Sequence, residues 1–594
     1  MPTSFPDDLS QQQLDCLFPV RRPLIRPDVF EIGLVLGGTV SAGAYTAGVL
    51  DYLVEALDAW TRAKEQGDPY VPTHEVIVST IAGASGGGIY GGVFARAMGW
   101  SFEHGTSEKN PFFQVAMGVD LVDLLSPGPE HGLSGLASLL NCSALDEQTA
   151  RSIEYEGGKL GDLETPRQRS YLADPLRLFV MVGNLAGLPY TIRLAGGSKL
   201  THDLIEHVDF MRFGLRVDGG PPNLPATRED EIPLSSYSSG NWDLLRAAVL
   251  ASSAFPAAFR SRPLQRSLAA CGYRVTLVPG EAGNPRVAQL IPRWDVLSAG
   301  EPNESIVNFA AVDGGTFNNQ PLDIVRTALA GLNGRNKRGG EAADRAVILI
   351  DPFSDPVPLG PRQPPGALGL LRPFLTALIY QSRFKPEDIA LAEEPDVYSR
   401  FLIAPYGPGG GDTPISGKGA IASGGLGGFL GFVDRKFLDY DYQLGRRNAY
   451  EFLRRDFVFP EGNRIFVCKW NDAQKQDQRR DLQQSGVIPV KPGYLPMIPL
   501  VQRLRENPPP PMTKENWPRL DDIPANLSPA IEGRLQAVYD LLMAEHRPSS
   551  CWKSLAISLG LGVPWNVFLR RTLRDKALDE IQSALRDQRL LKSR

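Results

Sequence analysis

Two glycine-rich loops in the first hundred residues each separate a short apolar run from a helical pattern. The first unit reads FEIGLVLGG from residue 30 and continues into AYTAGVLDYLVEALDAW, whose apolar positions recur at helical spacing. The second reads HEVIVSTIAG from residue 74 and passes through ASGGG into IYGGVFARAMGW. Two strand–loop–helix units in succession predict a mainly parallel sheet covered by helices, which places the chain in the α/β class.

The rest of the chain is expected to extend this core rather than repeat it. Three more apolar, β-branched runs are predicted strands of the same sheet: residues 178–185, 306–312 and 346–350. At 594 residues, one large domain with elaborations or two to three domains are expected. The predicted organisation is an N-terminal arm (1–27), a main α/β domain (28–353) with an insertion at about 100–168, glycine- and proline-rich loops and helices packed on it (354–506), and a helical C-terminal extension (507–594).

Composition excludes several classes of function. The formal net charge is only −5 and the basic residues form no large block, which argues against nucleic acid as a partner. The N-terminus lacks the features of an export signal, and the apolar segment 555–569 is shorter than the ~20 residues of a spanning helix. We expect a protein of a reducing, cytoplasmic compartment without a disulfide framework, a zinc site or another metal, since its five cysteines are scattered: Cys16, Cys142, Cys271, Cys468 and Cys551.

Ser85 is the candidate nucleophile. It lies at the centre of Gly83-Ala84-Ser85-Gly86-Gly87, the one G-x-S-x-G in the chain, between a predicted strand (Val76–Ala82) and a predicted helix (Gly88–Met98). Glycines on both sides allow a strand to turn sharply into a helix with the serine hydroxyl at the apex. The alternative interpretation is a glycine-rich close contact between strand and helix.

A nucleophilic serine needs a base, and the histidines of this chain are poorly placed to serve. His74 begins the strand that ends near Ser85, so it should lie more than ~20 Å from the serine, at a surface or edge. His546 is the one histidine after Asp313 and leaves a Ser-Asp-His triad open, although it follows the proline-rich tract 507–512. A solvated side chain is expected for the four remaining histidines, His104, His131, His202 and His207.

Asp313 is the better-placed candidate base. It ends the apolar run IVNFAAV and is followed by Gly314 and Gly315, and strand ends on one side of a parallel sheet are where functional sites collect. Since an ordinary aspartate, with a pKa of about 3.9, is a weak base, the site must partly desolvate the carboxylate or stabilise the transition state strongly. A simple Asp-Gly-Gly turn is the alternative.

The first glycine loop, Gly37–Gly43, is the candidate oxyanion site. It lies between a strand and the start of a helix, so its backbone N–H groups and the helix N-terminus are suited to bind a developing negative charge. A nucleotide-phosphate loop is disfavoured, because neither G-x-x-x-x-G-K-[ST] nor G-x-G-x-x-G is present there.

Together these motifs resemble the patatin-like phospholipase family. Its glycine loop before GAY, its G-x-S-x-G elbow, an A-S-S-A-x-P segment and D-G-G occur here in the family's order, at Gly43–Tyr45, Gly83–Gly87, Ala251–Pro256 and Asp313–Gly315. The resemblance implies a three-layer α/β/α fold and an acyl-enzyme on Ser85, with Asp313 accepting its proton and no cofactor. It also implies that oxyanion and substrate contacts come from Gly37, Gly38, Thr39, Val40 and Gly86. Ala42 departs from the family, which usually carries Arg or Lys there.

The predicted function is therefore hydrolysis of lipid acyl esters. The insertion and the glycine-rich loops are expected to form a lid or acyl-chain pocket, and peripheral contact with the inner face of a membrane is an option for the basic tail 570–594. Arg446 and Arg447 are candidates for contact with an anionic head group, or else form a solvated helix face. Two alternatives remain: an acyltransferase or thioesterase that uses the same serine, and a non-catalytic lipid-binding scaffold. The sequence assigns neither a head group nor an oligomeric state.

Overall fold

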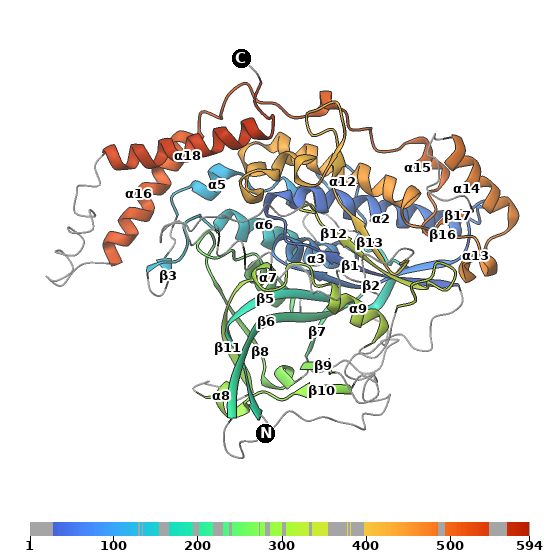
Figure 1. The fold of residues 1–594 in the computed structure, drawn as a ribbon, viewed down its shortest axis with the longest axis horizontal. Helices are drawn as coiled ribbons and strands as arrows, with labels where there is room; N and C mark the ends of the chain where they lie inside the picture. Colours follow the sequence, from blue (N-terminus) through green and yellow to red (C-terminus); the bar gives the residue numbers. More distant parts are fainter. Residues whose placement is uncertain are drawn as a thin grey trace.

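The computed structural model places a large mixed sheet at the centre of the molecule (Figure 1). The expected N-terminal arm lies outside the described part of the chain. The structure describes residues 28–592 with the exception of 129–130, 133–134, 154–164, 194–200, 218–229, 237–239, 273, 279–285, 300–304, 332–335, 355–372, 374–376, 378–380, 382–396, 485–492 and 546–566.

Seven strands follow one another in the order β13-β12-β1-β2-β5-β11-β8, while β6 pairs with the other edge of β5 and β7 pairs with β6. β1, β2, β12 and β13 are parallel to their neighbours, and β2 is also parallel to β5. The predicted strands therefore do join one sheet. The bounds are β1 Val29–Leu36, β2 Glu75–Gly83, β5 Leu172–Arg193, β6 Thr201–Arg216, β7 Glu231–Ser235, β8 Arg262–Ser267, β11 Ile306–Asp313, β12 Arg345–Ile350 and β13 Arg400–Ile403.

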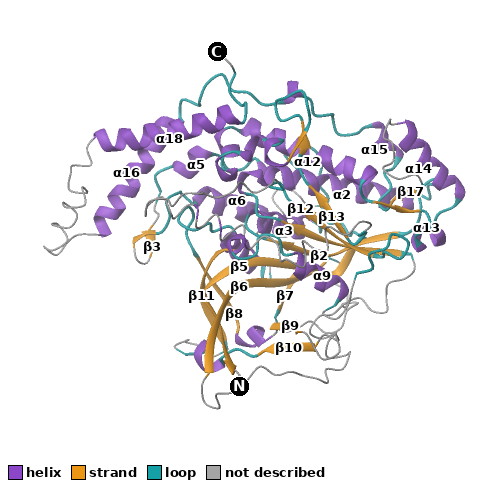
Figure 2. Ribbon diagram, viewed as in Figure 1, coloured by secondary structure: helices purple, strands orange, loops and turns teal. Residues whose placement is uncertain are grey.

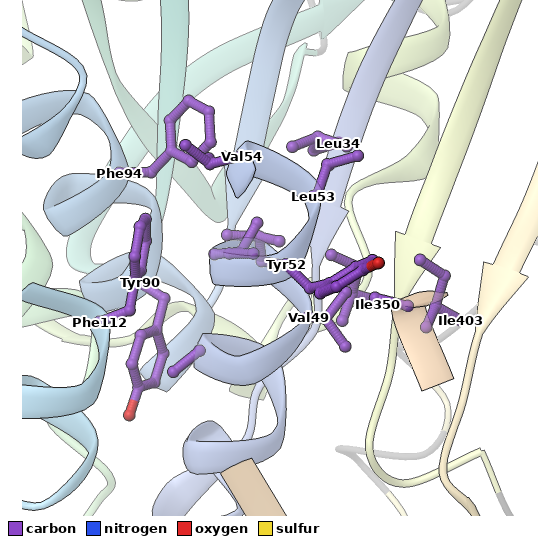
Figure 3. Packing of buried hydrophobic residues seen from close by; sticks show 14 of the residues in the cluster. Leu34, Val49, Tyr52, Leu53, Val54, Tyr90, Phe94, Phe112, Ile350 and Ile403 are labelled. Atoms are coloured by element: carbon purple, nitrogen blue, oxygen red, sulfur yellow. The ribbon is translucent and has the colours of Figure 1, made fainter. Parts of the chain in front are cut away.

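Helices cover both faces of this sheet, as expected for an α/β/α arrangement. Alternate residues of β1 point to opposite faces: Leu34 joins the large core, and Val35 joins a smaller cluster beneath one helix. Figure 3 shows Leu34 beside Leu53 of the first long helix, and Val49 of the same helix near Ile350. One face carries α2 Gly43–Glu65, α3 Gly86–Ala97, α7 Trp242–Ser252 and α12 Arg435–Arg455, and the other carries α9 Leu322–Ala330 (Figure 2).

Two strands arrive at the same edge of β5 from opposite directions. β2 runs parallel to β5 and ends with Gly83 opposite Val180. β11 runs antiparallel to β5 and ends with Asp313 opposite Val182. Because β6 occupies the other edge of the same stretch of β5, the carboxyl ends of β2 and β11 face each other across a short gap. This antiparallel arrival of β11 was not predicted.

The regions outside the sheet are mainly helical. The insertion contributes α4 Pro111–Ala116, α5 Leu121–Leu125 and α6 Ser143–Ile153 within its described part. The C-terminal extension contributes α16 Leu527–Glu545 and α18 Val567–Asp587, which lie side by side in Figure 1. Arg534 of α16 donates hydrogen bonds to the carbonyl groups of Ser138 and Leu139 in the insertion. No helix in the described ranges is long and apolar enough to cross a membrane.

α12 packs very closely against α2, although nearly 400 residues separate the two helices in sequence (Figure 1). Two glycines make this approach possible. A Cβ added to Gly48 of α2 would lie 2.0 Å from the carbonyl oxygen of Tyr442, and one added to Gly445 of α12 would lie 2.2 Å from that of Tyr45. The backbones of the two helices are thus in direct contact, and α12 is part of the core.

Replacement of glycine by alanine usually stabilises a helix, but at this contact between the two helices it should destabilise the protein. Gly48→Ala should lower the free energy of unfolding by about 1–3 kcal/mol, because the added methyl group overlaps the backbone of α12. The matched control is Gly533→Ala in α16, where no atom lies within 4 Å of the added Cβ. This control should raise the free energy of unfolding by up to about 1 kcal/mol through helix propensity. Urea unfolding of both variants tests the prediction, and stabilisation by Gly48→Ala would contradict it.

Candidate active site

Ser85 occupies a strained turn between β2 and α3. Its backbone angles are φ +54° and ψ −131°, a combination that costs about 1–3 kcal/mol for a residue with a side chain. The neighbouring glycines allow the turn to close, since a Cβ on Gly83 would lie 2.4 Å from the carbonyl oxygen of Gly87. A Cβ on Gly87 would in turn lie 2.3 Å from the carbonyl oxygen of Leu36 in β1. The G-x-S-x-G segment therefore has the geometry of a nucleophile elbow.

Asp313 meets this serine directly. The Ser85 hydroxyl donates a hydrogen bond of 2.8 Å to Oδ2 of Asp313, and the N–H of Gly315 donates one of 2.7 Å to Oδ1. The carboxyl group is only 3% exposed, and this burial raises the pKa of Asp313 to about 7 despite the two hydrogen bonds, which lower it. Asp313 is thus desolvated, which is the condition under which an aspartate could serve as a base.

The segment Ala251–Pro256 links both residues of this pair. The hydroxyl of Ser252 accepts a hydrogen bond of 3.0 Å from the Ser85 N–H, and the hydroxyl of Ser253 donates one of 3.1 Å to the Ser85 carbonyl oxygen. The carbonyl oxygen of Ala254 accepts one of 3.0 Å from the Asp313 N–H. The sequence motif marked this segment, but its role as a bracket that holds the elbow and the end of β11 together emerges only in the structure.

The glycine loop after β1 offers unpaired backbone donors next to Ser85. Gly37 is not one of these donors, because its N–H group donates a hydrogen bond to the carbonyl oxygen of Ile350. Gly37 was among the predicted oxyanion contacts, and its N–H group is not available for that role. A Cβ on Gly86 would lie 2.2 Å from Thr39 Oγ1 and 3.5 Å from the Val40 nitrogen, so the loop is packed against the elbow. Four N–H groups make no hydrogen bond with any residue that the structure describes: those of Gly38, Thr39, Val40 and Gly86.

Val40 gives this loop a second strained residue. Its φ of +49° is left-handed, which for a β-branched residue is a rare conformation that costs about 1–3 kcal/mol. Such a conformation persists only where the surrounding structure holds it. Ala42, which takes the position of the family's basic residue, is fully buried.

Asn319 is a site residue that the sequence analysis did not identify. A Cβ added to Gly38 would lie 2.3 Å from its Oδ1 and 3.2 Å from Ser85 Cβ, and one added to Gly315 would lie 2.6 Å from the same oxygen. The Asn319 amide therefore fills the space between the glycine loop and the turn after Asp313. One indication in the sequence that Asn319 could belong to the site was its position six residues after Asp313.

No histidine of the described residues joins the pair. In the part of the chain that the structure describes, none hydrogen-bonds to Ser85 or Asp313, and His546 of the alternative triad lies outside it. His74 is fully buried rather than at a surface, because its ring lies between Trp60 and Trp470 and Nε2 lies 2.9 Å from the Met497 carbonyl oxygen.

Two further predictions about charged side chains were wrong. His104 is not solvated, since its Nδ1 lies 2.7 Å from Oδ1 of the buried Asp51. Arg446 of α12 does not face solvent or a head group, because it forms ion pairs with Asp51 and Glu55 of α2. Arg447 pairs with Glu451 of the same helix. The ion pairs of Arg446 join α12 to α2.

The described ranges contain neither a cluster of metal-ligating side chains nor a disulfide. No group of three or more His, Cys, Asp or Glu side chains there is arranged to hold a metal ion. Three cysteines fall in these ranges, and all are free: Cys142, Cys271 and Cys468.

Comparisons with known proteins bear on the family of this chain. A sequence profile of the family described as "Patatin-like phospholipase" matches residues 34–326. The chain is 32% identical over 599 residues to the "Uncharacterized protein y4iI" of Sinorhizobium fredii, a match that covers 94% of this chain and 81% of that protein. Among solved structures, VipD from Legionella pneumophila aligns over 94% of this chain and 88% of its own with 10% identity. Its TM-score of 0.23 carries no structural argument.

Removal of the buried charge should stabilise the protein at alkaline pH. Because burial raises the pKa of Asp313 to about 7, the folded state binds the proton more tightly than the unfolded state. The contribution of this proton to the free energy of unfolding is therefore fully present below about pH 4 and is lost as the pH rises through about 7. Relative to wild type, Asp313→Asn should raise the free energy of unfolding by on the order of 2–4 kcal/mol at about pH 8, and by little at about pH 4.

Urea unfolding at the two pH values measures this difference. Asp579→Asn, a substitution of an exposed carboxylate on α18, is the control and should show the same small effect at both. A gain in Asp313→Asn that does not grow with pH would contradict the prediction.

A methyl group at Gly38 should disturb the site without disturbing the fold. Gly38→Ala places a Cβ against both Asn319 and Ser85 and should slow the reaction of Ser85 with a fluorophosphonate probe about a hundredfold, because it shifts the backbone donors. Gly339→Ala is the control, since no atom lies within 4 Å of its added Cβ. Equal labelling rates for the two variants would show that the loop tolerates the shift.

Proposed function

The chain belongs to the patatin-like phospholipase family, and from that membership we propose that it hydrolyses carboxylic esters of lipids through an acyl intermediate on Ser85. Asp313 is the base in this proposal. The observation that carries it is the hydrogen bond of 2.8 Å from the Ser85 hydroxyl to the buried carboxylate of Asp313.

In the first step, Ser85 Oγ forms a bond to the carbonyl carbon of the ester while its proton passes to Asp313 Oδ2. The proton need travel only along the existing hydrogen bond. A pKa near 7 makes Asp313 a far better base than an ordinary carboxylate, because catalytic efficiency is greatest when the pKa of the base lies near the working pH.

The tetrahedral intermediate places a negative charge on the former carbonyl oxygen. We assign its stabilisation to the N–H groups of Gly38, Thr39, Val40 and Gly86, which have no hydrogen-bond partner among the described residues and lie on the elbow or on the loop packed against it. Collapse of the intermediate breaks the ester C–O bond, and the proton held by Asp313 passes to the leaving alkoxide.

Asp313 then acts a second time. It takes a proton from water as the water oxygen attacks the acyl carbon, and Ser85 leaves with that proton while the fatty acid is released. One carboxylate thus serves both steps, and the proposal requires neither a histidine nor a metal ion.

An acyl chain suits the surroundings of the pair. Phe255 lies in the segment that brackets Ser85 and Phe259 follows that segment, while Phe429 follows Gly428, which contacts the glycine loop. The rings of Phe259 and Phe429 stack with their centroids 6.3 Å apart. These half-buried aromatic side chains belong to, or directly follow, segments that contact the elbow and the glycine loop, and they offer apolar surface to an acyl chain.

The nucleophile can be tested with a fluorophosphonate probe. The protein is treated with the probe in buffer and in detergent, and the modified peptide is located by mass spectrometry. We expect modification at Ser85 in wild type and none in Asp313→Asn. Absence of modification under both conditions would favour a non-catalytic lipid-binding protein.

Substitutions should separate the dyad from a triad. Ser85→Ala and Asp313→Asn should each reduce esterase activity by at least about a thousandfold while circular dichroism shows a native fold. His546→Ala should retain activity within about twofold, because the dyad proposal assigns this residue no step. A folded but inactive His546→Ala variant would replace the dyad with a triad.

The pH dependence of the rate should report on the same carboxylate. Because the base must be ionised, kcat/KM for a soluble ester should rise with pH and level off above about 7. Steady-state rates between about pH 5 and pH 9 measure this profile. A profile without this rise would remove Asp313 as the base.

Product analysis distinguishes the hydrolase from an acyltransferase. Incubation of the enzyme with a lipid ester, with and without a short alcohol, should give free fatty acid as the main product in both cases. A main product that carries the alcohol would move the assignment to acyl transfer.

A further inference from the structure

The glycine loop contacts a segment that lies outside the residues matched by the family profile. This segment, residues 417–433, is called the strap. It consists of short turns at Gly417–Gly419, Ala422–Gly424, Leu426–Gly428 and Leu430–Val433, and the last three of these contact the turn Val40–Ala42. The strap and the loop lie almost 400 residues apart in sequence, so their contact is purely tertiary.

Ser41 joins the two segments. Its hydroxyl donates a hydrogen bond to the carbonyl oxygen of Gly428 and accepts one of 3.0 Å from the N–H of Gly431. The side chain is 3% exposed. The Ser41 hydroxyl group thus makes one hydrogen bond as donor and one as acceptor, both with the strap. Ser41 directly follows the strained Val40.

Glycines let the strap come close to the loop. Gly428 has a φ of +95°, and a Cβ there would lie 3.2 Å from Val40 Cβ and 2.8 Å from the ring of Phe353. A Cβ on Gly431 would lie 2.5 Å from Ser41 Oγ. The strap therefore packs directly against the residue whose unusual backbone conformation needs support.

The strap is itself anchored to α12. The buried carboxylate of Asp441 accepts hydrogen bonds of 2.7 Å and 3.0 Å from the N–H groups of Ala422 and Ser423. α12 packs against α2 through Gly48 and Gly445, and α2 begins directly after the glycine loop. Loop, α2, α12 and strap thus form a closed ring of contacts.

We propose that Ser41 is a positioning residue that holds the oxyanion loop in its working conformation by hydrogen-bonding to the strap. Its hydroxyl does not touch the substrate. It keeps the N–H groups of Thr39 and Val40 directed toward the place where the oxyanion forms, and so makes a segment outside residues 34–326 necessary for full activity. This inference rests on the proposed function, because it concerns the rate of acyl transfer to Ser85.

Ser41→Ala is the decisive variant. Since the loop stabilises the transition state rather than the bound ester, kcat should fall about tenfold to a hundredfold while KM stays within about twofold. Labelling of Ser85 by a fluorophosphonate should slow by the same factor. Ser41→Thr keeps the hydroxyl and should recover most of the rate.

The control and a second variant separate positioning from general damage. Ser152→Ala removes a comparably buried hydroxyl, which bonds to the Gln148 carbonyl oxygen in α6, and should leave both rates unchanged. Gly431→Ala disturbs the same link from the strap and should reproduce the loss of kcat. This variant decides the question if Ser41→Ala does not fold.

Each outcome bears on a different claim. An active wild type whose Ser41→Ala and Gly431→Ala variants keep full kcat and labelling rates would overturn this inference and leave the proposed function standing. Equal losses in Ser41→Ala and Ser152→Ala would also overturn it. A wild type that neither hydrolyses esters nor labels at Ser85 would overturn the proposed function, and the inference with it.

Discussion

The site depends on the way two strand ends meet on one edge of β5. β2 and β11 approach that edge from opposite directions, and their last residues pair with Val180 and Val182. Two positions along a strand span about 6–7 Å, which brings the elbow after β2 within hydrogen-bonding distance of Asp313. Because ladder hydrogen bonds hold both strands, the distance between Ser85 and Asp313 does not depend on a long flexible loop.

The same burial that forms the site makes it energetically costly. Asp313 loses solvation, and Ser85 and Val40 hold backbone conformations that few residues adopt. The closely packed sheet and helices around them offset these costs. The fold therefore brings together the features that the proposed chemistry uses: a carboxylate with a raised pKa, a serine hydroxyl group at a sharp turn, and backbone N–H groups without a hydrogen-bond partner among the described residues.

The C-terminal part of the chain belongs to the same core as the matched domain. α12 touches α2 through facing glycines, and Arg446 forms ion pairs with Asp51 and Glu55 across the same contact. Through Asp441 and the strap, this helix reaches the loop beside Ser85. What resembles an appendage in sequence is therefore continuous with the site in space.

The sequence by itself determined the local features of this protein. The strand–loop–helix units, the elbow at Ser85 and the position of Asp313 at a strand end all follow from patterns within a dozen neighbouring residues, which periodicity and glycine placement encode. Tertiary structure alone decided the direction of β11, the bracket from Ser252 to Ala254, the burial of His74 and the place of the strap. Each of these depends on contacts between residues more than a hundred positions apart. Local pattern carries no information about such pairs, because their partners are chosen by packing and hydrogen bonding in the folded chain.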